Sequence, residues 1–240
     1  MRRLFYKGVL KEEIEIEGAD AHHLKTVNRA KLNDEITVVD DVNAAARMQI
    51  AGFTDNGVLL KLVEKIPLIG ESKTKLTLAL ALLKGDKTDT AAQKATELGV
   101  SRIIPLITER VVVKLDEEKR KIKRNRLEKI ATEAAKQSGG LPPEVFPIMS
   151  LDEFLKTPPK NLIFFYENEE NVSLKDTLSN VKGDDITLLI GAEGGFSASE
   201  AENIIKNGGA ATTLGRRILR AETAAITAVA LTMYERGELR

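Results

Sequence analysis

Buried-strand patterns alternate with amphipathic stretches along the chain from residue 75 onwards. The strand candidates are apolar runs, and residues 186–190 are also rich in β-branched residues, as expected of a strand that is covered on both faces. These runs are residues 76–83, 103–107, 161–167 and 186–190. Residues 89–98 fit a helix, and such alternation favours a mainly parallel sheet with helices on both faces. We therefore predict an α/β domain over residues 75–240.

The first part of the chain has a different pattern, in which short alternating runs are separated by Asn-Asp, Asp-Asp and Asn-Gly turn signals. The predicted strands lie at residues 14–16, 35–39, 47–50 and 58–63. Runs of this length and spacing are typical of a small β domain, which we expect to be a barrel. The predicted organisation is thus a β domain over residues 1–68, a linker over 69–74 and the α/β domain over 75–240.

A glycine-rich loop follows the predicted strand at residues 186–190. Gly191, Gly194 and Gly195 remove three side chains within five residues, so the backbone can adopt positive φ and a ligand can approach the main chain. The capping box at residues 197–200 then begins a helix. A glycine loop between a parallel strand and a helix is typical of a ligand-binding loop.

A second loop of this kind lies close to the end of the sequence. A short predicted strand at residues 210–214 ends at Gly215, and an alanine-rich helix runs from Ala221 towards Tyr234. The loop carries more charge than a turn requires, in Arg216, Arg217, Arg220 and Glu222. Two such loops in succession predict one shared pocket.

The two loops resemble the signature of the RsmE family, the 16S ribosomal RNA uracil-N3 methyltransferases of the SPOUT class. The signature residues are Ile-Gly-Ala-Glu-Gly-Gly-Phe at 190–196 and Leu-Gly-Arg-Arg-Ile-Leu-Arg-Ala-Glu-Thr-Ala at 214–224. Further stretches that fit the family are residues 22–24, 83–87, 93–100 and 133–138. Ala192 stands where the family usually has proline, Ala221 where threonine is common, and Gly140 where arginine often follows Gln-Ser-Gly.

The resemblance implies a trefoil knot in the last strands and helix, a PUA-like RNA-binding barrel before it, and a homodimer formed through the knotted domain. It also implies that S-adenosylmethionine is bound in the knot. The implied cofactor-binding residues are Tyr166, Leu189, Gly191, Glu193, Gly194, Gly195, Leu214, Gly215, Ile218, Leu219 and Thr223. Leu189, Leu214, Ile218 and Leu219 are the apolar members of this set, which would shelter the adenine.

The implied substrate is 16S rRNA, which we expect to be bound within the small ribosomal subunit. The residues expected to contact RNA are Arg2, Arg3, Lys7, His22, His23, Lys25, Arg29 and Lys31. The target uridine has to be unpaired or flipped out, because N3 lies on its Watson–Crick edge.

Methylation at N3 requires an imide proton to leave, and every pKa unit between that imide and its base costs about 1.36 kcal/mol. We hypothesise that Arg220 stabilises the uracil anion and that Glu193 or Glu222 acts as the base or orients Arg220. The alternative is that Glu222 stabilises the start of the final helix and pairs with Arg220 in a purely structural role.

Charge and composition bear on nucleic-acid binding, on disulfides and metal sites, and on membrane segments. The 36 basic and 36 acidic residues balance, so net charge gives no argument for nucleic acid. Seven basic residues within 114–126, on a helix predicted to begin near Asp116, either contact phosphates or form a solvated face. Because cysteine is absent and only His22 and His23 provide imidazoles, we expect neither disulfides nor a metal site. No apolar run is long enough for a signal peptide or a membrane span, and we expect a cytoplasmic protein without a membrane partner.

Other nucleotide-binding motifs fit poorly. Residues 84–88 lack the upstream glycine of a P-loop, and residues 191–194 lack Gly-x-Gly-x-x-Gly spacing. Two alternatives stay open: a SPOUT enzyme that methylates the ribose 2′-oxygen of tRNA or rRNA, and a non-catalytic RNA-binding module.

Overall fold

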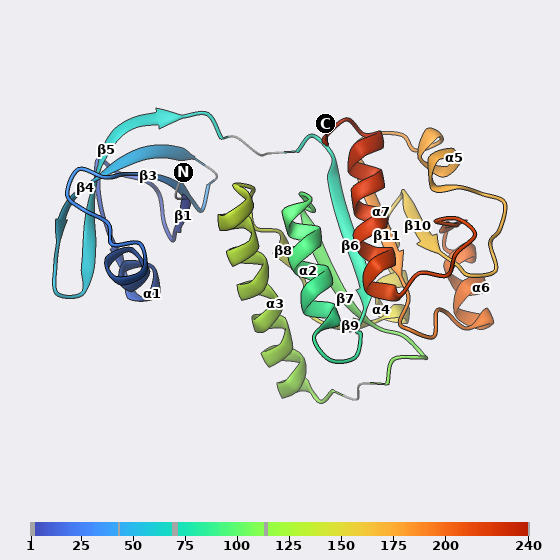
Figure 1. Ribbon diagram of the computed structural model, residues 1–240. Helices are drawn as coiled ribbons and strands as arrows, with labels where there is room; N and C mark the ends of the chain where they lie inside the picture. The colour runs from blue at the N-terminus through green and yellow to red at the C-terminus, as the bar shows by residue number, and fades with distance from the viewer. Residues whose placement is uncertain (1–2, 43, 69–71, 113–114, 240) are drawn as a thin grey trace. The chain divides into compact units, whose positions relative to one another are not determined.

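The computed structural model describes residues 3–42, 44–68, 72–112 and 115–239. The chain divides into two compact units, Met1–Glu71 and Ser72–Arg240 (Figure 1). Arg2, Lys114 and residues 69–71 of the predicted linker lie outside the described residues.

The N-terminal unit is built on a curled sheet whose described strands follow the order β1-β3-β4-β5-β2. The strands are β1 Arg3–Tyr6, β2 Glu13–Glu17, β3 Glu35–Asp40, β4 Ala45–Phe53 and β5 Gly57–Ile66. β1 runs parallel to β3, and the other neighbours are antiparallel. Within the described residues, β1 and β2 each pair with a single strand, so the sheet is a half-barrel where the pattern predicted a barrel. Two register shifts along β4 add to the curl.

Apolar residues that alternate with polar ones along these strands form the core of the N-terminal unit. Ile14 and Ile16 of β2 are buried, whereas the glutamates on either side of them are not. A short helical segment, α1 Gly18–His22 followed by the π-helical turn η1 His23–Val27, adds Ala21 and Leu24 to the same apolar cluster. The sequence pattern did not indicate this segment, because Ala21 and Leu24 are its only buried residues.

The C-terminal unit contains a parallel sheet with the described order β12-β10-β11-β6-β7-β8, and β9 also pairs with β7. The strands are β6 Lys75–Ala81, β7 Arg102–Ile107, β8 Glu144–Val145, β9 Met149–Ser150, β10 Leu162–Phe165, β11 Asp185–Ile190 and β12 Ala210–Thr212. β6 lies between two strands from distant parts of the chain, with Lys75 opposite Asp185 and Thr77 opposite Arg102. The predicted parallel sheet is confirmed.

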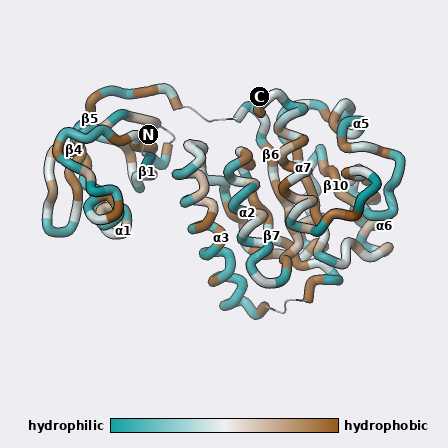
Figure 2. The backbone as a smooth tube through the Cα atoms, viewed as in Figure 1, coloured by the Kyte–Doolittle hydropathy of each residue, from teal (hydrophilic) through white to brown (hydrophobic). Residues whose placement is uncertain are grey.

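Helices cover both faces of this sheet, as predicted. They are α2 Lys87–Glu97, α3 Glu117–Ser138, α4 Leu151–Leu155, α5 Leu174–Ser179, α6 Ala198–Lys206 and α7 Ala221–Glu235. Leu78 and Leu80 of β6 join an apolar cluster with α2, α3, α5 and α7, whereas Ala79 joins a cluster with α4 and α6. Figure 2 shows the resulting hydrophobic strands at the centre of the unit. None of the described helices combines the length and the apolar character needed to cross a membrane.

The predicted capping box sets the direction in which the chain leaves the first glycine loop. The Ser197 hydroxyl accepts the Glu200 amide N–H at 3.2 Å, and the Glu200 carboxylate accepts the Ser197 N–H at 2.9 Å. The helix ends at Lys206, shortly before Gly208 with φ +85°.

Candidate functional site

The C-terminal ends of five strands meet at one edge of the parallel sheet. β6, β7, β10, β11 and β12 all run in the same direction, so the segments that follow them leave from the same side. β11 and β12 flank β10, which brings both glycine loops, residues 191–197 and 213–220 in the structure, to neighbouring positions. The sheet therefore brings the two predicted loops to one edge, and the shared pocket remains a prediction.

The first loop is a tight turn that needs glycine at two positions. The Gly195 N–H donates to the Ala192 carbonyl at 2.9 Å, and Gly195 has φ +67°. A Cβ on Gly191 would lie 3.0 Å from the carbonyl carbon of Gly195. The turn thus places backbone where a side chain would otherwise stand.

Residues from two other strand ends hold this turn. The Arg110 guanidinium, after β7, donates to the Gly194 carbonyl and lies 3.7 Å from the carboxylate of Glu167, after β10. The Glu109 N–H donates to Glu200 Oε1 at 2.8 Å. Sequence reasoning missed Arg110 and Glu167, because neither belongs to a motif and strand order alone brings them to Gly194.

Lys87, the first residue of α2, lies between the two predicted catalytic glutamates. Its Nζ is 3.6 Å from Glu193 Oε1 and 3.9 Å from Glu222 Oε1. Glu193 Oε1 also accepts the Lys84 N–H at 3.0 Å. Sequence reasoning did not select Lys87, although it lies in one of the stretches that resemble the family.

The environment of Glu193 makes its carboxylate a weak base. Burial raises the pKa of Glu193, but hydrogen bonds from the Lys84 and Glu193 amides and the ammonium of Lys87 lower it further, and the net shift is downward. A carboxyl with a lowered pKa holds a proton less readily. Its contacts therefore fit an anchoring role for the first loop.

Glu222 has one oxygen in an ion pair and one without a partner. It lies in the first turn of α7, where the helix dipole favours a negative charge. Its Oε2 is buried and makes no hydrogen bond within the described part of the protein. Leaving such an oxygen unpaired costs about 1–3 kcal/mol or more. This oxygen can accept a hydrogen bond from an N–H or O–H donor.

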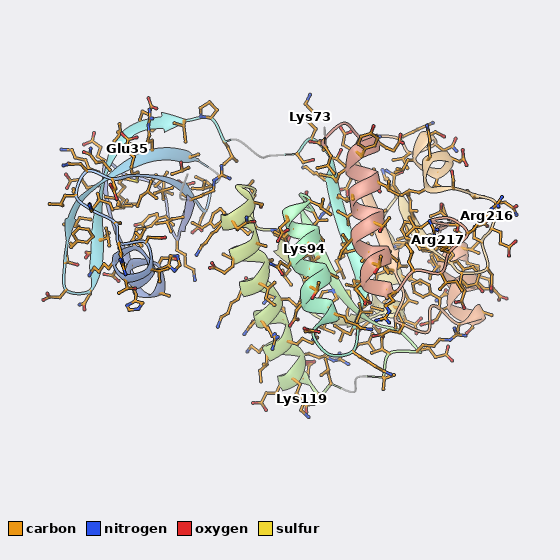
Figure 3. All side chains as sticks on the ribbon, viewed as in Figure 1. Glu35, Lys73, Lys94, Lys119, Arg216 and Arg217 are labelled. Atoms are coloured by element: carbon orange, nitrogen blue, oxygen red, sulfur yellow. The ribbon has the colours of Figure 1, made fainter. Side chains whose placement is uncertain are left out.

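The second loop is open. Gly215 has φ +112°, and its N–H donates to Thr213 Oγ1 at 3.2 Å. Beyond it the residues are mostly exposed, and Ile218 reaches 89%. The side chains of Arg216, Arg217 and Arg220 have no hydrogen bond or ion pair with any described residue, and Figure 3 shows the first two at the outside of the unit. Both glutamates pair with Lys87 rather than with Arg220.

The other predicted cofactor residues lie at different depths. Tyr166 packs on Phe164, with ring centroids 5.9 Å apart, and its N–H donates to the Thr212 carbonyl at 3.3 Å. Leu189 is fully buried in the core, Leu214 packs against the cluster beneath α7, and Leu219 is half-buried. Thr223 is exposed in the first turn of α7.

The predicted RNA contacts belong to the N-terminal unit and are mainly exposed. Lys7, His22, His23, Arg29 and Lys31 are exposed, and Arg3 is half-buried in β1. Lys25 Nζ donates to the Thr54 carbonyl at 2.6 Å, so its cation is partly used inside the unit.

The basic cluster on α3 is partly structural. Arg126 Nη2 lies 2.6 Å and Lys123 Nζ 4.0 Å from the carboxylate of Asp89, a buried residue of α2. Arg124 Nε donates to the Val145 carbonyl at 3.0 Å. These residues attach α3 to its neighbours, which favours the structural interpretation for this part of the cluster.

Comparisons with known proteins identify both units. Residues 70–233 match the RNA methyltransferase domain family, and residues 16–63 match the RNA methyltransferase PUA domain. The ribosomal RNA small subunit methyltransferase E of Rickettsia conorii is 36% identical over 95% of this chain and 93% of its own length. The protein of the same name from Bacillus subtilis is 32% identical over 100% of this chain and 99% of its own.

Solved structures resemble the whole chain. A ribosomal RNA small subunit methyltransferase E from Neisseria gonorrhoeae, bound to S-adenosylmethionine, gives a TM-score of 0.86 with 29% identity over 97% of both chains. A methyltransferase from Legionella pneumophila in complex with the same cofactor gives 0.88 with 29% identity, over 97% of this chain and 96% of its own.

Proposed function

Because the chain belongs to the RNA methyltransferase family that includes the ribosomal RNA small subunit methyltransferases E, we propose that it methylates N3 of a uridine in 16S rRNA, with S-adenosylmethionine as methyl donor. The observation that carries this proposal is the meeting of both signature loops at one sheet edge, around the unpaired buried oxygen of Glu222. A mere turn between a strand and a helix requires no such arrangement.

The residues at this edge fit the cofactor. S-adenosylmethionine, when bound, supplies an electrophilic methyl group. The turn at residues 191–195 would offer main-chain groups to it, because glycine allows close approach. Tyr166, Leu214, Gly215 and Thr223 would line the same space, and Ile218 and Leu219 would cover its apolar part, with Leu189 supporting them from the core.

Proton removal is assigned to the glutamate that has a free oxygen. Glu222 Oε2 has no partner in the described protein, so it can accept the uracil N3 proton. Arg220, two residues earlier, would stabilise the charge that develops on the uracil oxygens. Glu193 would hold the first loop in place through Lys84 and Lys87, since the lowered pKa of its carboxyl makes it a weak base.

The N-terminal unit would present the RNA. Its PUA-like half-barrel exposes His22, His23, Arg29 and Lys31, which would contact phosphates and sugars of the 16S rRNA around an unstacked uridine. Arg2, Arg3, Lys7 and Lys25 are the other proposed contacts. The assembled small ribosomal subunit is the proposed form of the substrate.

A knot and a homodimer complete the proposal. The chain passes from β11 through α6 on one face of the sheet to β12, and α7 then packs on the opposite face. The Thr213 N–H donates to the Val172 carbonyl at 2.9 Å, which holds the segment before the second loop against the loop after β10. This arrangement supports a SPOUT trefoil knot, an exception to the rule against knots. Leu231 and Tyr234 on α7 are 43% and 63% exposed, and we propose that a second copy covers them.

The test is methyl transfer from labelled S-adenosylmethionine to purified small ribosomal subunits that lack this modification, followed by digestion and mass analysis of the nucleosides. We expect 3-methyluridine, and no incorporation into subunits that already carry it. Label on ribose would replace the proposal by 2′-O-methylation. Cofactor binding without product would indicate another RNA or assembly state, and absence of cofactor binding would indicate a non-catalytic RNA-binding module.

A further inference from the structure

Lys87 is an unexpected residue at its position. It begins α2, and the positive end of a helix dipole disfavours a cation there. Its neighbours compensate, because two carboxylates lie within 4 Å of its ammonium. Across the described part of the chain, no other lysine or arginine forms an ion pair with Glu193 or Glu222.

The ion pairs of Lys87 join three segments that are far apart in sequence. Glu193 belongs to the first loop, Glu222 to the start of α7, and Lys87 to the connection between β6 and α2. The Lys84 N–H adds a second bond from that connection to Glu193, whereas Glu222 Oε1 is held by Lys87 alone among the described residues. Glu222 therefore depends on Lys87 more than Glu193 does.

We propose that Lys87 is a positioning residue, which ties the start of α7 to the first loop and fixes the Glu222 carboxylate so that Oε2 accepts an N–H from the bound ligand. This inference rests on the proposed function. Two N–H donors are available in that reaction: the imide of the target uracil and the α-ammonium of S-adenosylmethionine. Both would form a charge-assisted hydrogen bond to the carboxylate.

A double-mutant cycle tests the proposal. The variants are Lys87→Met, which keeps the length of the side chain, Lys87→Arg, which keeps the charge, Glu222→Gln, and Lys87→Met combined with Glu222→Gln. Lys94→Met is the matched control, since Lys94 is also a lysine of α2 paired with a glutamate, Glu97, at 2.9 Å (Figure 3). Thermal melting of each variant establishes that it is folded.

Two quantities are measured for each variant: the affinity for S-adenosylmethionine by calorimetry without RNA, and kcat and KM for methylation of small subunits. We expect Lys87→Met to lose at least thirtyfold in kcat or in cofactor affinity, and the double variant to be within threefold of Glu222→Gln. Lys87→Arg should keep at least a third of the kcat and of the cofactor affinity of the unaltered protein. Lys94→Met should match the unaltered protein in both quantities.

The quantity that changes identifies the donor. Loss confined to kcat, with cofactor affinity within threefold, assigns the imide N–H; a non-additive loss of cofactor affinity assigns the α-ammonium. Additive effects of the two substitutions, or a fully active Lys87→Met, would overturn the proposal. If even the unaltered protein makes no 3-methyluridine, the proposed function fails; a non-additive loss of cofactor affinity would then still support the role of Lys87, and unchanged affinity would overturn it.

Discussion

The two glycine loops have similar sequence patterns, each a glycine-containing segment between a strand and a helix. They differ in the structure, because the first is held by contacts with other segments and the second is exposed. The first is held by Arg110, Lys84 and Lys87, and its turn closes on itself through Gly195. The second follows Gly215 into exposed residues, and its arginine side chains make no hydrogen bond or ion pair with the described protein. The first loop is thus fixed by contacts within the protein, whereas the exposed side chains of the second loop are free to contact a ligand, RNA or a second copy.

The largest effect should come from the open loop. Arg220→Ala should reduce turnover by about 10²–10³-fold, because it removes a donor that stabilises the developing anion. Cofactor affinity should stay within a few fold, since Arg220 is proposed to act on the uracil rather than on the cofactor. Turnover on small subunits and calorimetry measure the two quantities, with Arg216→Ala as the control in the same loop. An active Arg220→Ala enzyme would refute the assignment.

Two alanine substitutions compare the loops directly. Gly191→Ala places a Cβ 3.0 Å from the Gly195 carbonyl carbon, and the free energy of unfolding should fall by about 1–3 kcal/mol. The Cβ of Gly215→Ala meets no atom within 4 Å, but φ +112° strains it by about 1–3 kcal/mol. Because the second loop can relax when free, this cost should appear in cofactor affinity. Equal losses of thermal stability in the two variants would show that the loops are equally rigid.

Ile218→Ser tests whether the open loop closes over the cofactor. Covering an isoleucine contributes about 1.5–3 kcal/mol, so the affinity for S-adenosylmethionine should fall about tenfold or more. The melting temperature without cofactor should not change, because Ile218 is already 89% exposed. Ile205→Ser on α6, 53% exposed, is the control. Unchanged affinity would remove Ile218 from the adenine site.

The smallest effect concerns the closed loop and depends on pH. The lowered pKa of Glu193 means that its ionised form stabilises the fold above the unfolded value of about 4.3, and that this contribution is lost as pH falls through the folded pKa. The free energy of unfolding of Glu193→Gln should therefore be lower than that of the unaltered protein at pH 7, by less than about 1 kcal/mol, and the difference should disappear as the pH falls through the folded pKa. A difference in unfolding free energy that persists once the Glu193 carboxylate is protonated would indicate a steric cause.

Sequence reasoning succeeded where the signal is local. The buried strands, the capping box at Ser197 and the helix that starts after Asp116 follow from patterns within a few residues. The half-barrel was predicted as a barrel, since closure depends on whether β1 meets β2 and no local pattern encodes that. β12 ends at Thr212, before the predicted Leu214.

The sequence predicted the loops of the site but not the ion pairs and hydrogen bonds that hold them. Both glycine loops were recognisable because glycine restricts what the backbone must do. Lys87, Arg110 and Glu167 were not, because each meets its partner across strand ends that are distant in sequence. Their roles depend on strand order, which the apolar pattern does not specify.

The position of β6 at the middle of its sheet also has a consequence during protein synthesis. Lys75 pairs with Asp185, so one side of β6 stays without its partner strand until 110 more residues have been made. At about 5–20 residues per second, the growing chain carries that open edge for about 6–22 s. The strands of the N-terminal unit, which end at Ile66, are already complete by then. The nascent chain therefore passes through a stage with one finished sheet and one exposed strand edge, at which chaperone binding would protect it from pairing with another chain.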